Sequence, residues 1–217
     1  MKQYDLHIHT HYSSCSNLKP EKILKYAKRK NLDGIAITDH HTIRGALEVQ
    51  KINDNPELDI IIGEEFETEN GHVIGYFLKK EIKPGKFKDV VREIKKQGGI
   101  AAAAHPYDFG RRMKRLEEVK LLDAIEVLNG RMRTPFGNKK AKELAETYSL
   151  GKTAGSDAHF FFEIGKARAV FEGRIRKSIL NGSIKPEGWG VQNPLAGLMS
   201  MISMAFRKLN PFNRIKH

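Results

Sequence analysis

Histidines and carboxylates at particular spacings are the residues of this chain best suited to chemistry. The sequence contains nine histidines, and His7 and His9 stand two positions apart. Side chains two apart on a strand point to the same face, so both imidazoles can bind one ion. The remaining candidate ligands are spread along the chain: His40, Glu65, His72, His105, Asp157 and His159.

These residue types indicate a metal centre. A lone histidine at the end of a strand is usually a hydrogen-bonded polar residue, and it is the number of such positions that favours a metal role. Imidazole and carboxylate ligands without thiolate suit Zn, Mn or Fe. A bridging carboxylate can hold two cations about 3.5–4 Å apart, as in two-metal phosphatases and nucleases. We therefore expect two or three divalent ions as cofactors.

The elements that must position these ligands alternate short apolar runs with helical patterns, which is typical of βα units. Strands are predicted at residues 4–8, 35–37, 59–63, 73–78, 100–104, 124–128, 152–154 and 167–171. Helices are predicted at residues 20–30, 43–52, 87–97, 135–148 and 175–180. This order favours a parallel barrel over an open sheet. Parallel barrels build their sites at the C-terminal ends of the strands, where the candidate histidines fall.

Several motifs, taken in order, resemble those of the PHP family, whose name stands for polymerase and histidinol phosphatase. They are His7-x-His9, Thr38-Asp39-His40, Gly63-Glu64-Glu65, Ala104-His105-Pro106 and Ser156-Asp157-Ala158-His159. The resemblance runs from about residue 3 to about residue 183. It implies an α/β fold, a distorted TIM-like (β/α)7 barrel, with a trinuclear metal centre at its C-terminal face. It also implies an enzyme that hydrolyses phosphoric esters with metal ions.

The resemblance further implies how the ligands are shared among the ions. The first ion is bound by His7, His9, Glu65 and Asp157, the second by Glu65, His72 and His105, and the third by His40 and His159. Glu65 thus bridges the first two ions. Its neighbour Glu64 is expected to be a solvated residue.

One segment departs from the family pattern. Members that hydrolyse phosphomonoesters often follow His-x-His-Thr with a Ser-Asp-Gly segment, whose Asp helps to bind the third ion. Here residues 11–17 read His-Tyr-Ser-Ser-Cys-Ser-Asn, without an acid. The third site therefore lacks an expected ligand. A thiolate of Cys15 is one replacement, and a packed or hydrogen-bonded cysteine is the alternative.

The expected reaction follows from the metal ions. A bound divalent ion lowers the pKa of water towards about 7, so we expect a metal-bound hydroxide to attack phosphorus in line. Glu65, Asp157 and His159 are the predicted catalytic residues, and Asp157 or His159 would also relay protons.

Two basic clusters beyond strand ends bear on the substrate. Arg111 and Arg112 belong to one cluster, and Arg131 and Arg133 belong to the other. Arginine forks match phosphate oxygens, and aromatic side chains can stack on a base. Aromatic residues lie nearby at Tyr107, Phe109 and Phe136. We predict that these arginines bind a nucleotide or short oligonucleotide. The alternatives are a histidinol-phosphate-type small-molecule phosphatase and a non-catalytic metal-binding structural module.

Composition sets wider bounds. The 217 residues are 40% hydrophobic and 29% charged with a formal net charge of +12, which suits one compact domain with an anionic partner, or solubility alone. The N-terminal residues lack the pattern of a signal peptide, and no run approaches the roughly 20 apolar residues that span a bilayer. Cys15 is the single cysteine, which excludes an intramolecular disulfide. We expect a cytoplasmic protein.

The composition changes near the C-terminus. We predict a barrel domain at residues 1–183 and a tail at residues 184–217. Apolar residues recur at helical spacing over residues 195–209, with basic residues beside and after them. This amphipathic basic helix would pack on the barrel or on a second copy of the chain, and an anionic membrane surface is the alternative.

Overall fold

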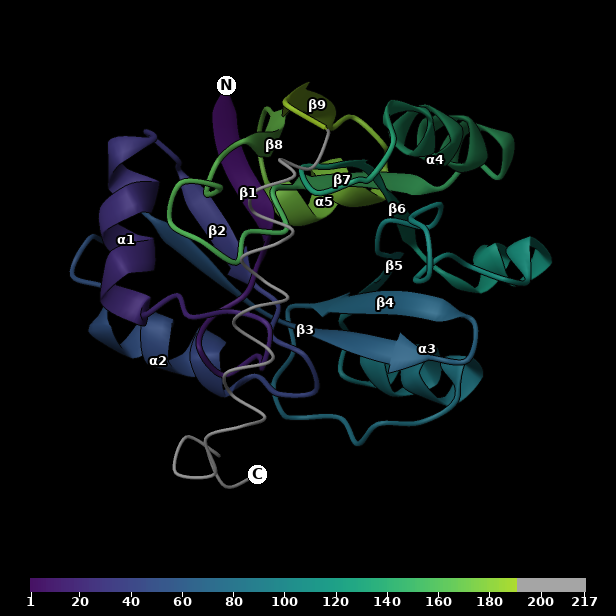
Figure 1. Ribbon diagram of the computed structural model, residues 1–217, viewed down its shortest axis with the longest axis horizontal. Helices are drawn as coiled ribbons and strands as arrows, with labels where there is room; N and C mark the ends of the chain where they lie inside the picture. Colours follow the sequence, from purple (N-terminus) through teal and green to yellow (C-terminus); the bar gives the residue numbers. More distant parts are fainter. Residues whose placement is uncertain (191–217) are drawn as a thin grey trace.

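The structure, a computed structural model, describes residues 1–190, so the helix predicted at 195–209 lies outside the described residues. The described strands form one sheet in the order β7-β6-β5-β4-β3-β2-β1-β8-β9, which curves into a nearly closed barrel (Figure 1). The strands are β1 (Lys2–Ile8), β2 (Gly34–Ile37), β3 (Asp59–Thr68), β4 (Gly71–Tyr76), β5 (Ile100–Ala103), β6 (Ala124–Asn129), β7 (Gly151–Gly155), β8 (Ala167–Phe171) and β9 (Lys185–Gly188). The predicted distorted barrel is confirmed.

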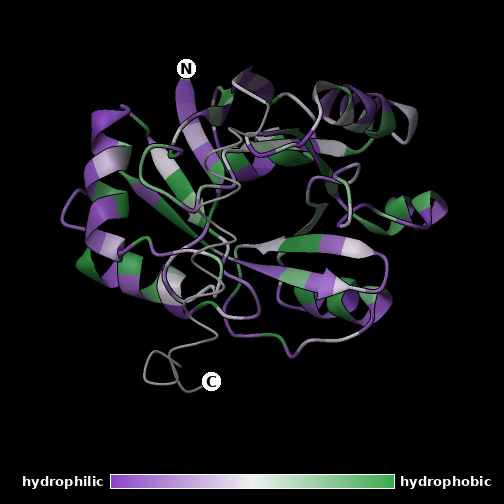
Figure 2. Ribbon diagram, viewed as in Figure 1, coloured by the Kyte–Doolittle hydropathy of each residue, from purple (hydrophilic) through white to green (hydrophobic). Residues whose placement is uncertain are grey.

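Helices cover the outside of the barrel (Figure 1). They are α1 (Pro20–Arg29), α2 (Arg44–Ile52), α3 (Phe87–Lys96), α4 (Pro135–Thr147) and α5 (Ile175–Leu180), with a 3-10 helix η1 at Leu116–Leu121. Hydrophobic and hydrophilic stretches alternate along them, as Figure 2 shows. In α3 the side chains of Val90, Val91 and Ile94 are buried. Each such burial contributes about 1.5–3 kcal/mol, which holds the helix against the sheet. Among the described residues, no helix is long and apolar enough to cross a membrane.

The barrel closes where β1 meets the chain that follows β7. The amide of His9 donates to the carbonyl oxygen of Ala158 at 3.0 Å, and the amide of Ala158 donates to the carbonyl oxygen of His7 at 3.3 Å. Gly155 permits this approach, because a Cβ atom there would lie 2.5 Å from the backbone nitrogen of His7. The first residues of β1 pair instead with β8. Closure is therefore confined to one end of the barrel, the end at which β1 finishes.

The strand predicted at 73–78 does not run parallel to its neighbours. β4 pairs antiparallel to both β3 and β5. Only Glu69 and Asn70 connect β3 to β4, and a two-residue loop can join only antiparallel strands. The expectation of a parallel barrel is wrong here, and it is also wrong for the strand predicted at 167–171, because β8 pairs antiparallel with β1. As a consequence His72, near the start of β4, lies opposite Glu67 near the end of β3. It therefore reaches the same end of the barrel as the ligands that follow parallel strands.

The interior of the barrel is filled by side chains, so the site can lie only at its end. Leu6, Ile74 and Tyr76 are fully buried inside it together with small alanines from β2, β5 and β7. The hydroxyl of Tyr76 donates to the carbonyl oxygen of Leu6 at 3.1 Å, which satisfies the one polar group that this ring brings into the core.

Candidate metal centre

The eight side chains that the sequence predicts as metal ligands gather at one end of the barrel. His7 lies in β1, Glu65 in β3 and His72 in β4, whereas His9, His40, His105, Asp157 and His159 lie in loops that follow strands. They form overlapping groups whose ligand atoms lie within 4.8 Å of one another. Seven of the eight residues are buried, and His40 is the exception, with 16% of its side chain exposed. Solvent therefore reaches the cluster beside His40.

Four ligand atoms define the first group. The Nε2 atoms of His7 and His9 lie 3.1 Å apart. They lie 3.5 and 3.3 Å from Oε2 of Glu65, and 3.6 and 3.2 Å from Oδ1 of Asp157. Metal bonds of about 2.0–2.2 Å place tetrahedral ligand atoms about 3.3–3.6 Å apart. The spacing of these four atoms therefore suits one tetrahedrally bound ion.

The hydrogen bonds around His7 and His9 fix which nitrogen of each ring has a free lone pair. Ser13 gives its single hydroxyl proton to Asp39 at 2.6 Å, so Ser13 Oγ must accept from Nδ1 of His9 at 3.2 Å. Nδ1 of His7 lies 2.9 Å from a carboxylate oxygen of Glu126, which accepts its proton. Both Nε2 atoms are then left with lone pairs directed at each other. Such an arrangement favours a cation between them.

Glu65 connects the first group to a second. Its Oε1 atom lies 3.0 Å from Nδ1 of His72 and 3.0 Å from Nε2 of His105, whereas its Oε2 atom faces His7 and His9. Oε2 of Glu65 and Oδ1 of Asp157 are both buried without a hydrogen-bond donor. Unpaired buried carboxylate oxygens are rare and costly unless an ion satisfies them. The residues present therefore fit a pair of metal ions bridged by Glu65.

The electrostatics of the cluster demand positive charge. Burial favours the neutral form of Glu65, but the histidines around it, with His7 as the charged one, outweigh burial and hold the pKa of that carboxyl well below its usual range. For Asp157, His7 and His9 outweigh burial in the same way and lower the pKa. Burial favours neutral His7, but Asp157 and other nearby acids raise its pKa well above the usual value. A bound divalent ion would supply the charge that His7 otherwise takes up as a proton.

His40 and His159 have the opposite tendency. Burial is the main cause that lowers the pKa of His40 to about 3 and the pKa of His159 well below its usual value. Both imidazoles are therefore neutral, as a metal ligand must be. Nδ1 of His159 donates to the backbone carbonyl oxygen of Asp157 at 2.8 Å, which leaves its Nε2 free to bind. His159 groups with His9 and Asp157, and His40 groups with His9 and Cys15.

Two ligands lie on unusual backbone. Asp157 has a φ of 56° and His105 a φ of 28°, a region that residues other than glycine seldom adopt. Strain of this kind persists where the surrounding structure imposes it, and it is concentrated at functional sites. His105 lies two residues after β5 and Asp157 two residues after β7. The strained turn therefore directs each side chain across the end of the barrel.

Glu126, which the sequence motifs do not include, lies fully buried in β6. One carboxylate oxygen accepts from Nδ1 of His7, and the other accepts from the backbone amide of His105 at 2.8 Å and from Nδ2 of Asn129 at 3.0 Å. A single side chain thus orients ligands of both groups. Its signal in the sequence was an acid in the middle of an otherwise apolar predicted strand.

Glu64 behaves differently from the solvated neighbour that was expected. Its side chain is fully buried on the opposite side of β3 from Glu65, and Oε2 accepts from the backbone amide of Ile82 at 3.4 Å. Successive residues of a strand face opposite sides, so only one of the two glutamates can reach the metal cluster. Glu65 is the one that faces the histidines, with Oε1 3.0 Å from His72 and from His105.

The predicted substrate arginines occupy three kinds of position. Arg111 reaches the cluster: Nε and Nη2 donate to Oδ2 of Asp108 at 3.0 and 2.8 Å, and Nη1 lies 3.7 Å from Oδ2 of Asp157. Arg131 is buried and pairs with Glu163 at 3.6 Å. Arg133 and Arg112 are both exposed.

The two exposed arginines differ in how they are held. The backbone amide of Arg133 donates to the second oxygen of Asp108 at 3.2 Å, and Nη1 of Arg133 donates to the carbonyl oxygen of Phe109 at 3.0 Å. Asp108 therefore joins the loop after β5 to the loop after β6. The backbone of Arg112 packs beside Gly71, and its side chain lies at the surface.

Solved structures with the same fold come from several organisms. A two-domain protein from Bacteroides vulgatus, described as containing a predicted PHP-like metal-dependent phosphoesterase, aligns with a TM-score of 0.73 at 21% identity, over 87% of this chain and 65% of that one. PsfC from Pseudomonas syringae aligns with a TM-score of 0.67 at 22% identity, over 95% and 98%. A lesion-specific endonuclease from Pyrococcus furiosus aligns with a TM-score of 0.60 at 15% identity, over 86% and 57%. These likenesses show the fold.

Sequence comparisons add the family. Two uncharacterized proteins of Methanocaldococcus jannaschii are similar to this chain. One is 38% identical in an alignment of length 153 that covers 63% of this chain and 87% of the relative. The other is 35% identical in an alignment of length 177 that covers 77% of this chain and 69% of the relative. The model of the PHP domain matches residues 5–164. That match covers most of the chain and spans all eight predicted ligands, and the chain therefore belongs to the PHP domain family.

Proposed function

We propose that this chain is a metal-dependent hydrolase of phosphate esters whose substrates are nucleotides or short oligonucleotides. The observation that supports it most directly is the placement of Glu65, whose two carboxylate oxygens face two different groups of histidines. A carboxylate shared in this way is suited to hold two cations on either side of a phosphoryl group. Membership of the PHP family agrees with this chemistry.

The side chains present fit the ions that the family implies. His7, His9, Glu65 and Asp157 would hold one ion, Glu65, His72 and His105 a second, and His40 and His159 a third. Imidazole nitrogens and carboxylate oxygens favour Zn, Mn or Fe. When bound, such ions would lower the pKa of water and neutralise charge on the phosphoryl oxygens.

The remaining steps fall to the protein's own side chains. Arg111 is held by Asp108 through two of its donors, so Nη1 is the donor that faces the cluster beside Asp157. We assign this atom to a phosphoryl oxygen, because the guanidinium is already oriented before substrate arrives. His159 would hold an ion through Nε2, since its Nδ1 donates to the carbonyl oxygen of Asp157.

The rim of the site supports a substrate larger than a small amino-alcohol phosphate. Phe109 and Phe136 are 73% and 70% exposed, so both rings are accessible to a partner. Arg133 donates to the carbonyl oxygen of Phe109, so this bond brings a guanidinium from the loop after β6 to the loop that carries the exposed ring. We assign Phe109 to stacking on a base, and Arg112 and Arg133 to a phosphate beyond the one that is cleaved. Arg131 would affect substrate binding indirectly. It pairs with Glu163, and Glu163 holds the loop of His159 by accepting the backbone amide of His159 at 2.9 Å.

The test is metal analysis of the full chain together with an activity screen in added Mn²⁺ or Zn²⁺. The substrates are nucleoside 3′,5′-bisphosphates, short RNA and DNA, and histidinol phosphate, with Glu65→Gln as the inactive control. We expect turnover of a nucleotide or oligonucleotide by the wild type alone. Preferred turnover of histidinol phosphate would replace the substrate assignment. Full metal occupancy without hydrolysis of any of them would show a binding module instead.

A further inference from the structure

The loop between β1 and α1 folds Cys15 inward onto the metal cluster. The amide of His11 donates to the carbonyl oxygen of Leu18 at 2.8 Å, which closes the loop at its base. Ser16, next to Cys15, donates its hydroxyl to the carbonyl oxygen of His9 at 3.0 Å or of His159 at 3.2 Å. The position of the thiol is therefore fixed to the same two strand ends that bring ligands to the cluster.

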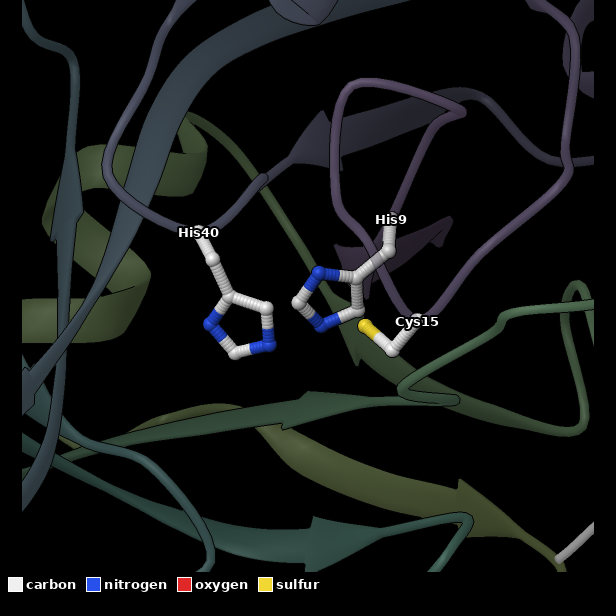
Figure 3. A group of neighbouring side chains, drawn as sticks. All are labelled: His9, Cys15 and His40. Atoms are coloured by element: carbon white, nitrogen blue, oxygen red, sulfur yellow. The ribbon is translucent and has the colours of Figure 1, made fainter. Parts of the chain in front are cut away.

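Cys15 lies with two histidines in an arrangement suited to bind an ion. Figure 3 shows the side chains of His9, Cys15 and His40 converging, and their ligand atoms lie within 4.8 Å of one another. Cys15 is a free and buried thiol, and His9 is fully buried. The rings of His9 and His40 stack with centroids 4.7 Å apart, so both imidazoles are held in place. One thiol and two imidazoles thus face a common point.

The surroundings of Cys15 disfavour a free thiolate at this position. Burial raises the pKa of Cys15, and the nearby carboxylates of Asp157 and Glu65 raise it further. A thiol in such a place is a poor nucleophile. Those same carboxylates attract a divalent cation, and a cation beside a thiol deprotonates it.

The shared histidine limits how the ions can be arranged. Nδ1 of His9 is occupied by Ser13, so only Nε2 can bind. One nitrogen binds one ion, and an ion at Cys15 therefore takes His9 from the group of Glu65 and Asp157. The ion beside Asp157 still has three candidate ligands without His9, because the ligand atoms of His7, His105 and Asp157 lie within 4.8 Å of one another.

We propose that Cys15, His9 and His40 form a zinc site with three protein ligands and an open fourth position. Three ligands with one open position are the pattern of catalytic zinc sites. A thiolate favours Zn²⁺ over Mn²⁺, which prefers oxygen ligands. The proposal rests on the metal centre of the proposed function, moves His9 and His40 from the first and third ions to one ion beside Cys15, and specifies which metal that position selects.

The test uses Co²⁺ in place of Zn²⁺ in the full chain, because a thiolate bound to Co²⁺ gives a strong charge-transfer absorption in the near ultraviolet. We expect this band in the wild type and in Ser14→Ala, an exposed neighbour that serves as the matched control. We expect Cys15→Ser to lack the band, and metal analysis to show that it loses its preference for Zn²⁺ over Mn²⁺.

The outcomes separate this proposal from the proposed function. Co²⁺ bound to the wild type without the band would overturn the thiolate ligand and leave the phosphoesterase metal centre standing. A band that persists in Cys15→Ser would also overturn it. Failure of the wild type to bind Co²⁺, Zn²⁺ or Mn²⁺ at all would overturn both. The wild-type spectrum decides the question even if a variant folds poorly.

Discussion

His7 and His9 direct their Nε2 atoms at each other across 3.1 Å, although the partners of their Nδ1 atoms leave both Nε2 atoms with lone pairs. Two lone pairs this close repel unless a proton or a metal ion lies between them. The buried carboxylates of Glu65 and Asp157 on either side make a divalent ion the more complete solution, since a single proton neutralises only part of their charge. The negative charge of these two buried carboxylates is therefore not fully compensated by the protein's own groups.

Removal of metal should destabilise the protein. A ligand present at 100 times its Kd stabilises the folded state by about 2.7 kcal/mol, and for a domain of this size each kcal/mol shifts Tm by about 2–4 °C. We expect chelation to lower Tm by several degrees and stoichiometric Zn²⁺ or Mn²⁺ to restore it. Differential scanning fluorimetry with and without chelator checks this. A Tm that is the same in both conditions would contradict a resident metal.

Glu65→Gln should remove the connection between the two ions. The amide cannot bridge them, because only one of its two end atoms has lone pairs for a cation. We expect metal occupancy to fall and kcat to drop by more than the about 10–100-fold that follows loss of a supporting hydrogen bond. Glu64→Gln is the matched control, since it changes the adjacent residue on the opposite side of β3. Equal activity of the two variants would show that Glu65 is not a bridging ligand.

Glu126→Gln should weaken metal binding without removing any ligand. The amide oxygen would accept from the backbone of His105, and the amide NH₂ would then face Nδ1 of His7. His7 would have to move its proton to Nε2, which is the atom that faces the ion. We expect the affinity for Zn²⁺ to fall about 10–100-fold, measured by competition with a chromophoric chelator.

The control for that experiment is circular dichroism, which should show an unchanged fold because the two side chains have nearly the same size. An unchanged Zn²⁺ affinity would mean that Glu126 does not set the proton position on His7. A folded protein with weakened binding and the eight predicted ligands intact would show that it does.

The order of the elements and the ligands could be predicted from the sequence because both are local patterns. Apolar runs of strand length and helical spacing mark the βα units, and the predicted ligands lie in strands or in the loops that follow them. The direction of β4 was missed because it depends on the two-residue connection through Glu69 and Asn70 and not on the strand itself. The boundary of the domain near residue 183 and the helix at 195–209 stay predictions.

The support of the ligands could not be predicted, because it depends on contacts between distant segments. Glu126 is 119 positions from His7, and nothing local shows that a strand acid will meet a histidine ring. Arg111 and Arg131 look alike in the sequence. Asp108 directs Arg111 towards the cluster, whereas Glu163 holds Arg131 beneath the loop of His159.

Arg111→Lys should impair phosphate binding while preserving charge. Lysine lacks the fork that Asp108 holds, so the donor that faces the cluster is lost. A hydrogen bond to a charged group contributes about 1.5–3 kcal/mol, which corresponds to a fall in kcat/KM of about 10–150-fold. Arg115→Lys is the control, because Arg115 pairs with Glu69 at 2.9 Å and Glu118 at 3.2 Å instead. Steady-state kinetics that affect both variants equally would remove Arg111 from substrate binding.

Glu64 should make stability depend on pH in the neutral range. Burial raises its pKa to about 8, opposed by the amide of Ile82. The unfolded chain releases this proton near its ordinary pKa, about 4.3, and the folded protein retains it up to about 8. Stability from this group is therefore complete below the unfolded pKa and is lost as pH rises through the folded one. Glu64→Gln cannot ionise, so its stability relative to the wild type should increase between pH 5 and pH 8, measured by urea unfolding of the metal-loaded protein. Glu57→Gln, a change at an exposed residue, should show no such increase. A stability difference between Glu64→Gln and the wild type that is the same at both pH values would contradict the raised pKa of Glu64.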